Sequence, residues 1–130
     1  MTISTDQTVS TILRLAAIAT LIIGLITLAA PEQIIRIFDG YDPGNYHFVR
    51  FVGTALIGFS VTNWLYSTFH DTRAVLPAIY GNLASLALAI GVDVVGLIEG
   101  SLSRAAWFVL LLHLAFTVAF VHCVRLIRSA

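Results

Sequence analysis

The chain has 130 residues, of which 58% are hydrophobic and only 11% are charged. Soluble domains carry roughly 25% charged residues, so this composition is typical of a protein that exposes most of its surface to lipid. Seven arginines balance seven acidic residues to a formal net charge of zero. That balance argues against nucleic-acid binding, which needs a basic excess to neutralise phosphates. A single cysteine, Cys123, excludes an internal disulfide, a cysteine-rich zinc site and an iron–sulfur cluster held by this chain alone.

Four stretches of the chain contain no Asp, Glu, Lys or Arg: residues 15–30, 51–69, 74–92 and 105–124. A helix that crosses the hydrocarbon core needs about 20 mostly apolar residues, so each stretch predicts a transmembrane helix. With their flanking residues, the predicted helices cover about 11–30, 48–69, 74–98 and 104–127. The predicted fold is all-α, a single domain over residues 1–130 in which four transmembrane helices form an antiparallel bundle.

The first connection, residues 31–47, is the only one with room for further structure. Pro31 suits the first position of a helix, and Gly40 suits its C-terminal stop. Between them the apolar residues fall on one side of a helix, namely Ile34, Ile35, Ile37 and Phe38, and the remaining residues are polar: Glu32, Gln33, Arg36 and Asp39. This pattern predicts a short amphipathic helix over about 31–39 that lies at the membrane surface.

The distribution of arginine predicts the orientation of the bundle. With four spans, both termini and the 70–73 connection share one side of the membrane, which holds Arg14, Arg73, Arg125 and Arg128. The opposite side holds Arg36, Arg50 and Arg104. Because cytoplasmic segments carry the excess of basic residues, the sequence predicts a multi-pass protein of the inner (cytoplasmic) membrane with both termini in the cytoplasm.

Two oppositely charged residues fall within the predicted spans. With a rise of about 1.5 Å per residue, Arg50 and Asp93 both lie roughly 10–13 Å from the midplane, in the outer leaflet. An unpaired charge is expensive in lipid, so we expect an Arg50–Asp93 ion pair between adjacent helices. The alternative is a polar pocket open to the outer face, with further polar residues around its mouth: Tyr46, His47, Glu99 and Arg104.

Asn63 and Asn82 form a second pair of polar residues that lie at the same calculated depth in the membrane. Each lies about four residues from the centre of its predicted helix, toward the cytoplasmic side. Hydrogen bonds between amide side chains commonly hold membrane helices together. The sequence therefore predicts a packing hydrogen bond between the two asparagines rather than a binding site.

The histidines raise the question of a metal or a pigment. His113 lies near the middle of the last predicted helix, and His122 lies nine residues later, on the opposite face and about 13 Å away. The two rings cannot bind one metal ion, and the sequence predicts no metal site. One interpretation of His113 is a core histidine that bonds a nearby Ser or Thr. The other is a single axial ligand for haem or a chlorophyll-type pigment.

The order of these elements resembles a known group of proteins. An apolar helix ends at Pro31-Glu32, a short amphipathic segment follows, and the next helix opens with Arg50, Gly53 and Gly58 in an Arg-x-x-Gly-x-x-x-x-Gly pattern. This layout resembles the DoxX-like group of small bacterial four-helix membrane proteins. The resemblance implies a left-handed four-helix bundle in the cytoplasmic membrane. For DoxX itself it also implies a subunit associated with quinone-linked sulfur oxidation.

We expect a non-catalytic accessory or structural subunit of a larger membrane complex, in contact with the lipid bilayer and with other membrane subunits or further copies of itself. The sequence contains no catalytic set of Ser, His and Asp, no carboxylate pair at one depth and no glycine-rich phosphate loop, so we predict no catalytic residues and no cofactor. One alternative is a redox subunit that binds quinone, haem or pigment near His113 or Arg50. Another is a small proton-coupled transporter, in which Asp93 would carry the proton.

Overall fold

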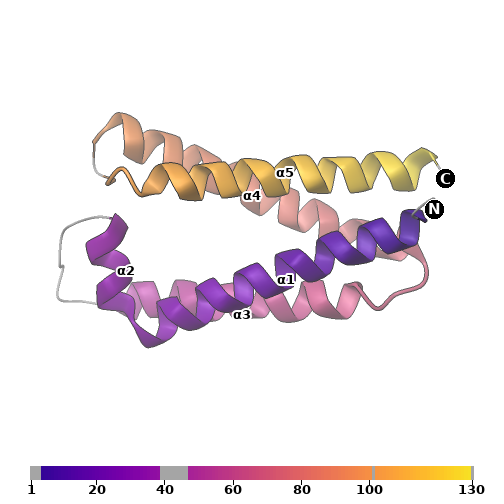
Figure 1. The fold of residues 1–130 in the computed structure, drawn as a ribbon, viewed down its shortest axis with the longest axis horizontal. Coiled ribbons are helices and arrows are strands. Elements are labelled where there is room, and N and C mark those ends of the chain that lie inside the picture. The colour runs from indigo at the N-terminus through magenta and orange to yellow at the C-terminus, as the bar shows by residue number, and fades with distance from the viewer. Residues whose placement is uncertain (1–3, 39–46, 101, 130) are drawn as a thin grey trace.

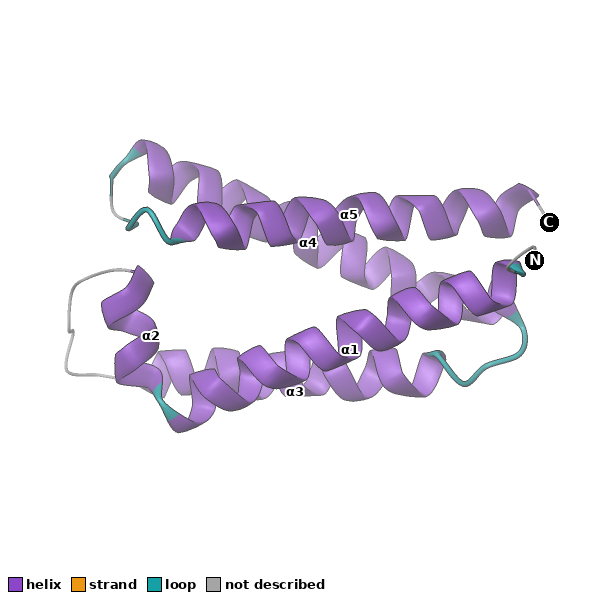
Figure 2. Cartoon of the chain, in the orientation of Figure 1, coloured by secondary structure: helices purple, strands orange, loops and turns teal. Residues whose placement is uncertain are grey.

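The computed structural model describes residues 4–38, 47–100 and 102–129. The described residues form helices and loops without any strand (Figure 2). The helices are α1 (Thr5–Ala29), α2 (Pro31–Phe38), α3 (His47–Tyr66), α4 (Leu76–Ile98) and α5 (Ala106–Ser129), with a 3-10 helix, η1 (Thr72–Val75), directly before α4. The expected all-helical fold is therefore confirmed.

Within the described parts of the chain, three helical segments are long and apolar enough to cross a membrane: Thr5–Ala29, Thr72–Ile98 and Ala106–Ser129. Of the four predicted spans, these three correspond to the first, third and fourth. Helix α3 is 20 residues long but also carries Arg50 and Asn63, and it does not belong to this set. A fourth span at α3 stays a prediction.

Helix α1 begins earlier than the apolar pattern indicates because its first turn is capped. The Ser4 hydroxyl accepts a hydrogen bond from the Gln7 backbone N–H, and the Gln7 side chain accepts one from the Ser4 N–H, both at 3.3 Å. This reciprocal arrangement satisfies two backbone donors that the helix itself leaves free. The helix ends at Ala29, because Pro31 disfavours a helical conformation for the residue before it and starts α2 instead.

Helices α1 and α3 lie side by side along most of their length (Figure 1). Their backbones meet at two glycines. A Cβ atom added to Gly24 would lie 2.9 Å from the Gly53 carbonyl oxygen, and one added to Gly53 would lie 2.9 Å from the Gly24 carbonyl oxygen. No larger residue fits at either position without moving a backbone, so these two glycines set the distance between α1 and α3.

Helices α4 and α5 form a second antiparallel pair, and the two pairs meet near the end of the molecule that carries both termini (Figure 1). The main buried cluster lies at that end and draws on α1, η1, α4 and α5; its members are Val9, Leu13, Ala16, Val75, Ile79, Phe120, Cys123 and Ile127. Toward α2 the two pairs diverge in the ribbon view. There the Ser103 hydroxyl donates a 2.6 Å hydrogen bond to the Ile37 carbonyl and joins α2 to the α4–α5 loop.

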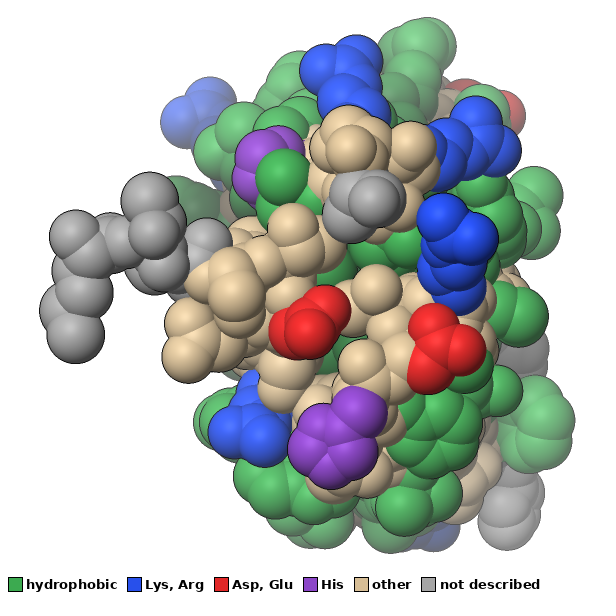
Figure 3. Space-filling view, turned by 90° about the vertical axis from the view of Figure 1, so that its right-hand side faces the viewer, with side chains coloured by type: hydrophobic (Ala, Val, Ile, Leu, Met, Phe, Trp, Pro, Cys, Tyr) green, Lys and Arg blue, Asp and Glu red, His purple; other side chains and the backbone are tan. Residues whose placement is uncertain are grey.

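The end that carries the termini is also where charged side chains gather (Figure 3). Asp6 lies in the first turn of α1, Arg73 in η1 and Arg128 in the last turn of α5. Arg128 donates a 2.8 Å hydrogen bond to the Tyr80 hydroxyl and so ties the end of α5 to α4. The long apolar helices thus run away from a polar end that suits a membrane–water boundary.

Candidate functional site

The main polar site within the apolar helices is a contact between Asp93 of α4 and His113 of α5. The His113 Nδ1 atom lies 2.7 Å from the Asp93 Oδ2 atom. The Asp93 side chain is 13% exposed and the His113 side chain is 25% exposed, so both are largely removed from the surface. Ionisable groups are rare in membrane-spanning segments and usually pair with one another, as these two do.

The short turn between α4 and α5 explains why these residues meet. Asp93 lies five residues before the end of α4 at Ile98, and His113 lies seven residues after the start of α5 at Ala106. In an antiparallel hairpin, residues at similar distances from the turn lie at similar levels. Counting from the turn would therefore have identified the pair, whereas counting from the centres of the predicted helices did not.

The contact also fixes the chemistry of the imidazole ring. When Asp93 is ionised its carboxylate only accepts hydrogen bonds, and the Nδ1 atom of His113 then carries the proton and donates the hydrogen bond to Asp93. In the neutral ring this leaves Nε2 as an acceptor with a free lone pair. No hydrogen bond between described residues reaches Nε2. The ring is thus held on one side by Asp93 and has an unoccupied acceptor on the other.

The expected Arg50–Asp93 ion pair is not what the structure contains. Asp93 pairs with His113, and no ion pair among the described residues joins it to Arg50, whose side chain is exposed on α3. The reason is the arrangement of the helices: α3 packs mainly on α1, and the two helix pairs diverge toward α2, where Arg50 lies (Figure 1). Equal depth in the membrane did not make the two residues neighbours.

The alternative outer pocket combines residues at the α4–α5 turn with residues outside the described part of the structure. Glu99 and Arg104 are exposed at the α4–α5 turn. Tyr46 and the side chain of His47 lie outside the described part of the structure. No ion pair among the described residues joins either of them to Asp93, whose largely buried side chain contacts His113 instead.

Asn63 and Asn82 lie together and link the two helix pairs. The Asn63 amide nitrogen donates to the Asn82 oxygen at 3.1 Å, and the Asn82 amide nitrogen donates to the Asn63 oxygen at 2.7 Å. Asn82 also donates a 2.8 Å bond to the Ala78 carbonyl, and Asn63 is fully buried. Every amide group of this contact has a partner, so its chemistry is that of a packing contact.

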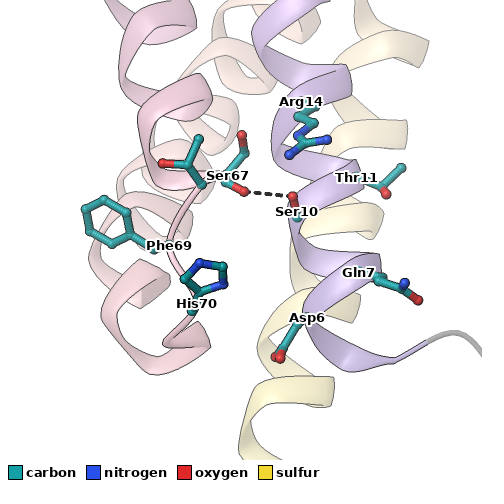
Figure 4. Close-up of a pocket in the computed structure, with 9 residues that line it drawn as sticks. Asp6, Gln7, Ser10, Thr11, Arg14, Ser67, Phe69 and His70 are labelled. Atoms are coloured by element: carbon teal, nitrogen blue, oxygen red, sulfur yellow. Dashed lines mark hydrogen bonds between the residues drawn. The ribbon is translucent and has the colours of Figure 1, made fainter.

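Sequence reasoning missed a polar cavity between the start of α1 and the segment after α3. Figure 4 shows Arg14, Asp6 and His70 among the side chains that line it. The signal was present as polar residues in successive turns of one α1 face, Gln7, Ser10 and Arg14. Within the described parts of the chain, no group of three His, Cys, Asp or Glu side chains is arranged to hold a metal ion.

Comparisons with known proteins add no relative. No protein-family model matches the chain, and neither a curated protein nor a solved structure matches it. The resemblance to the DoxX-like group stays a prediction that rests on the few sequence positions that carry it. The function is therefore inferred from the packing and the polar contacts of the chain itself.

Proposed function

We propose that this protein is a non-catalytic accessory subunit of a larger complex in the cytoplasmic membrane, with α4 and α5 as its contact surface. The observation that carries the proposal is how little of α4 the rest of the chain covers. In its most apolar 18-residue window no residue is buried, against 28% in α1. Leu88 and Val92, in the middle of the helix, are 75% and 70% exposed.

The small residues of α4 favour a protein partner over lipid as the cover. A Cβ atom added at Gly81 or Gly91 would meet nothing within 4 Å. A glycine weakens a helix by about 1 kcal/mol relative to alanine and offers lipid chains no surface, whereas it lets a neighbouring helix approach closely. Gly24 and Gly53 serve that purpose between α1 and α3. The open glycines of α4 suit the same contact with another subunit.

The Asp93–His113 pair supports the same surface. His113 keeps a quarter of its side chain exposed, and its Nε2 atom accepts no hydrogen bond from any residue that the structure describes. In the hydrocarbon core an unsatisfied polar atom costs several kcal/mol, because no water is present to bond it. A donor from a neighbouring subunit would satisfy Nε2 and cover the ring.

The proposed topology has four spans, including α3, with both termini in the cytoplasm. It is supported by the length of α3, whose 20 residues extend about 30 Å, close to the thickness of a hydrocarbon core. The four arginines on the side of the termini, against three on the other side, also support it. An amphipathic α2 at the opposite surface, and membership of the DoxX-like group, belong to the same proposal.

The test is to purify the tagged protein from its own membranes in a mild detergent and to identify bound subunits by native mass spectrometry. A Gly91→Leu variant adds bulk to the proposed contact surface, and Ala29→Leu places the same side chain at an exposed position of α1 as a control. We expect other subunits to accompany the wild type and the control, and to be lost by about tenfold or more from Gly91→Leu. A protein that elutes as a monomer or with copies of itself alone contradicts the proposal, as does a partner that both variants retain.

A second candidate function rests on the orientation of the His113 ring. Histidines that bind a metal usually donate their other ring N–H to a carboxylate, which is what Nδ1 does with Asp93. Nε2 is then suited to an axial bond to haem or a pigment, or to a hydrogen bond from a reduced quinone. In this case protein from native membranes shows a stoichiometric visible absorbance band, or a quinone mass, that His113→Ala removes and His122→Ala retains. Colourless protein without a small-molecule adduct eliminates this candidate.

A further inference from the structure

The open cavity at the terminus end is followed, nearer the middle of α1 and α3, by a second open cavity. The first has a volume of about 380 Å³ and is lined by polar residues of α1 and of the segment that follows α3. The second, of about 230 Å³, is lined by apolar residues of α1 and α3, among them Ala17, Leu21 and Trp64. Volumes of this size suit a bound small molecule or part of a lipid.

The two cavities share one face of α1. Ser10 and Arg14 line the polar cavity, and Ala17 and Leu21 line the apolar one, so the four residues follow one another at intervals of three or four. Residues at this spacing lie above one another on one side of a helix. On α3 the apolar cavity begins at Ser60 and the polar cavity ends beyond Ser67. The two cavities therefore follow one another along one side of the α1–α3 pair, the polar one at the terminus end and the apolar one nearer the middle of the helices, and we call the two together the groove.

The polar part of the groove contains one cation and one anion in a defined order. Arg14 lies nearest the apolar part, and Asp6 lies about two turns further out on the same helix. Figure 4 shows both side chains, with His70 and the Ser10–Ser67 contact between them. The Ser10 hydroxyl donates a 2.7 Å hydrogen bond to the Ser67 carbonyl and fixes the two walls of the cavity. No ion pair among the described residues engages Arg14 or Asp6.

We propose that this groove binds one phospholipid whose headgroup carries an amine, of the phosphatidylethanolamine class. From the membrane interior outward, such a lipid presents an acyl chain, a phosphate and an ammonium group. The groove presents complementary groups in the same order, an apolar cavity, Arg14 and Asp6. Side chains on a helix point toward its N-terminus, so Arg14 reaches outward to the phosphate level rather than into the hydrocarbon. One positive and one negative group match a zwitterion better than an anionic lipid.

The experiment measures lipid retention by the full-length protein in native mass spectrometry after reconstitution with equal amounts of phosphatidylethanolamine and phosphatidylglycerol. We expect the wild type to retain one phosphatidylethanolamine and to prefer it over phosphatidylglycerol. Arg14→Gln is expected to reduce retention of both lipids by about tenfold, because both phosphates lose a charge-assisted hydrogen bond. Asp6→Asn is expected to reduce retention of phosphatidylethanolamine alone.

Charge controls come from the neighbouring η1 segment. Arg73→Gln and Asp71→Asn remove the same charges at the same end of the molecule but outside the cavity lining, and they are expected to leave lipid retention unchanged. Val61→Trp fills the apolar part of the groove at an exposed position and is expected to lower retention of both lipids without altering the helical circular dichroism. Added phosphoethanolamine without acyl chains is expected not to displace the lipid.

Several results would overturn the inference. The wild type could retain phosphatidylglycerol as well as phosphatidylethanolamine, or Arg73→Gln could lower retention as much as Arg14→Gln. Either result would indicate a general attraction of lipid to the charged end rather than a site. Displacement by phosphoethanolamine alone, or stoichiometric retention of another kind of molecule, would show that the occupant is not a phospholipid. None of these results depends on whether α4 and α5 bind another subunit.

Discussion

The two helix pairs of this protein are held together in different ways. Between α1 and α3, Gly24 and Gly53 bring the backbones so close that an added Cβ atom would lie 2.9 Å from a carbonyl oxygen. Between α4 and α5, the described polar contacts are the hydrogen bond of Asp93 with His113 and that of Arg128 with Tyr80, and Gly81 and Gly91 of α4 face open space. The first pair finds its close backbone contact within the chain, whereas α4 of the second pair has no such contact at Gly81 or Gly91.

This difference shows how small residues should be interpreted in an apolar helix. Gly53 and Gly58 lie five residues apart on α3, yet the first is buried against α1 and the second has nothing within 4 Å. A small residue therefore marks close packing only where a neighbouring backbone lies opposite it. Gly81 and Gly91 of α4 therefore indicate a partner only together with the exposure of the helix as a whole, in whose most apolar 18-residue window no residue is buried.

The largest effect is expected where the packed pair is forced apart. Gly53→Leu places a side chain against the backbone of Gly24 and Leu28, and we expect it to destabilise the protein by about 3 kcal/mol or more. Gly58→Leu makes the same change on the same helix in open space, so its stability is expected to remain within about 0.5 kcal/mol of the wild type. Reversible unfolding in mixed micelles measures both. Equal losses would show that α1 and α3 are not held by this contact.

The polar contact of the second pair is expected to contribute less. His113→Leu leaves the Asp93 carboxylate without its partner in an apolar setting, and we expect a loss of about 2 kcal/mol. The double variant Asp93→Leu/His113→Leu removes both groups and is expected to cost less than the sum of the two single changes. A double-mutant cycle in the same unfolding assay gives the coupling directly. Additive losses would mean that the contact contributes nothing to the pairing of α4 with α5.

The contact between the two pairs is expected to be weaker still. The hydrogen bonds of Asn63 with Asn82 are of a kind that contributes about 0.6 kcal/mol on average in membrane proteins, and about 1.7 kcal/mol at most. We expect a coupling in that range from the cycle of Asn63→Leu and Asn82→Leu. A coupling well above it would show that the two pairs depend on the asparagines rather than on the buried cluster at the terminus end.

The smallest effect on the isolated protein is expected at the open surface of α4. Gly91→Leu meets nothing in the chain and replaces a poor helix former, so the purified protein is expected to lose no stability and to gain at most about 1 kcal/mol. A loss would show that Gly91 packs within the chain, and that its effect on subunit binding reflects misfolding. The same unfolding assay therefore also serves as the control for the copurification experiment.

The sequence was sufficient to predict the helices and one of the polar contacts. Uninterrupted apolar stretches locate the long helices, since their ends are marked by charges and by Pro31, although α1 begins at Thr5, six residues before its predicted start. Asn63 and Asn82 lie together in the structure at the depth that the sequence assigns to both. Here depth was a sufficient guide, because the two residues belong to helices that meet near the terminus end.

Membrane depth predicted the wrong partner for Asp93, because the depth of a residue does not indicate which helices are neighbours. The opposite charge of Arg50 made it the expected partner of Asp93. However, α3 packs mainly on α1, which leaves Arg50 away from α4. His113 was assigned nearer the midplane because α5 was expected to start at residue 104, two residues before its observed start at Ala106. That shift moves His113 about 3 Å toward the level of Asp93. The cavity beside Arg14 was missed for a related reason, since it depends on how α1 faces the segment after α3.

The most direct test of the α4–α5 contact surface is site-specific photo-crosslinking in native membranes. A photoreactive residue at Leu88 of α4 would probe the open surface, and one at Ile22 of α1, which is 52% exposed, would probe a surface that we assign to lipid. At Leu88 we predict a discrete adduct with another protein, whose mass differs from that of two linked copies of this chain. At Ile22 we predict no protein adduct. Lipid adducts alone at both positions would contradict the assignment of α4 and α5 to another subunit.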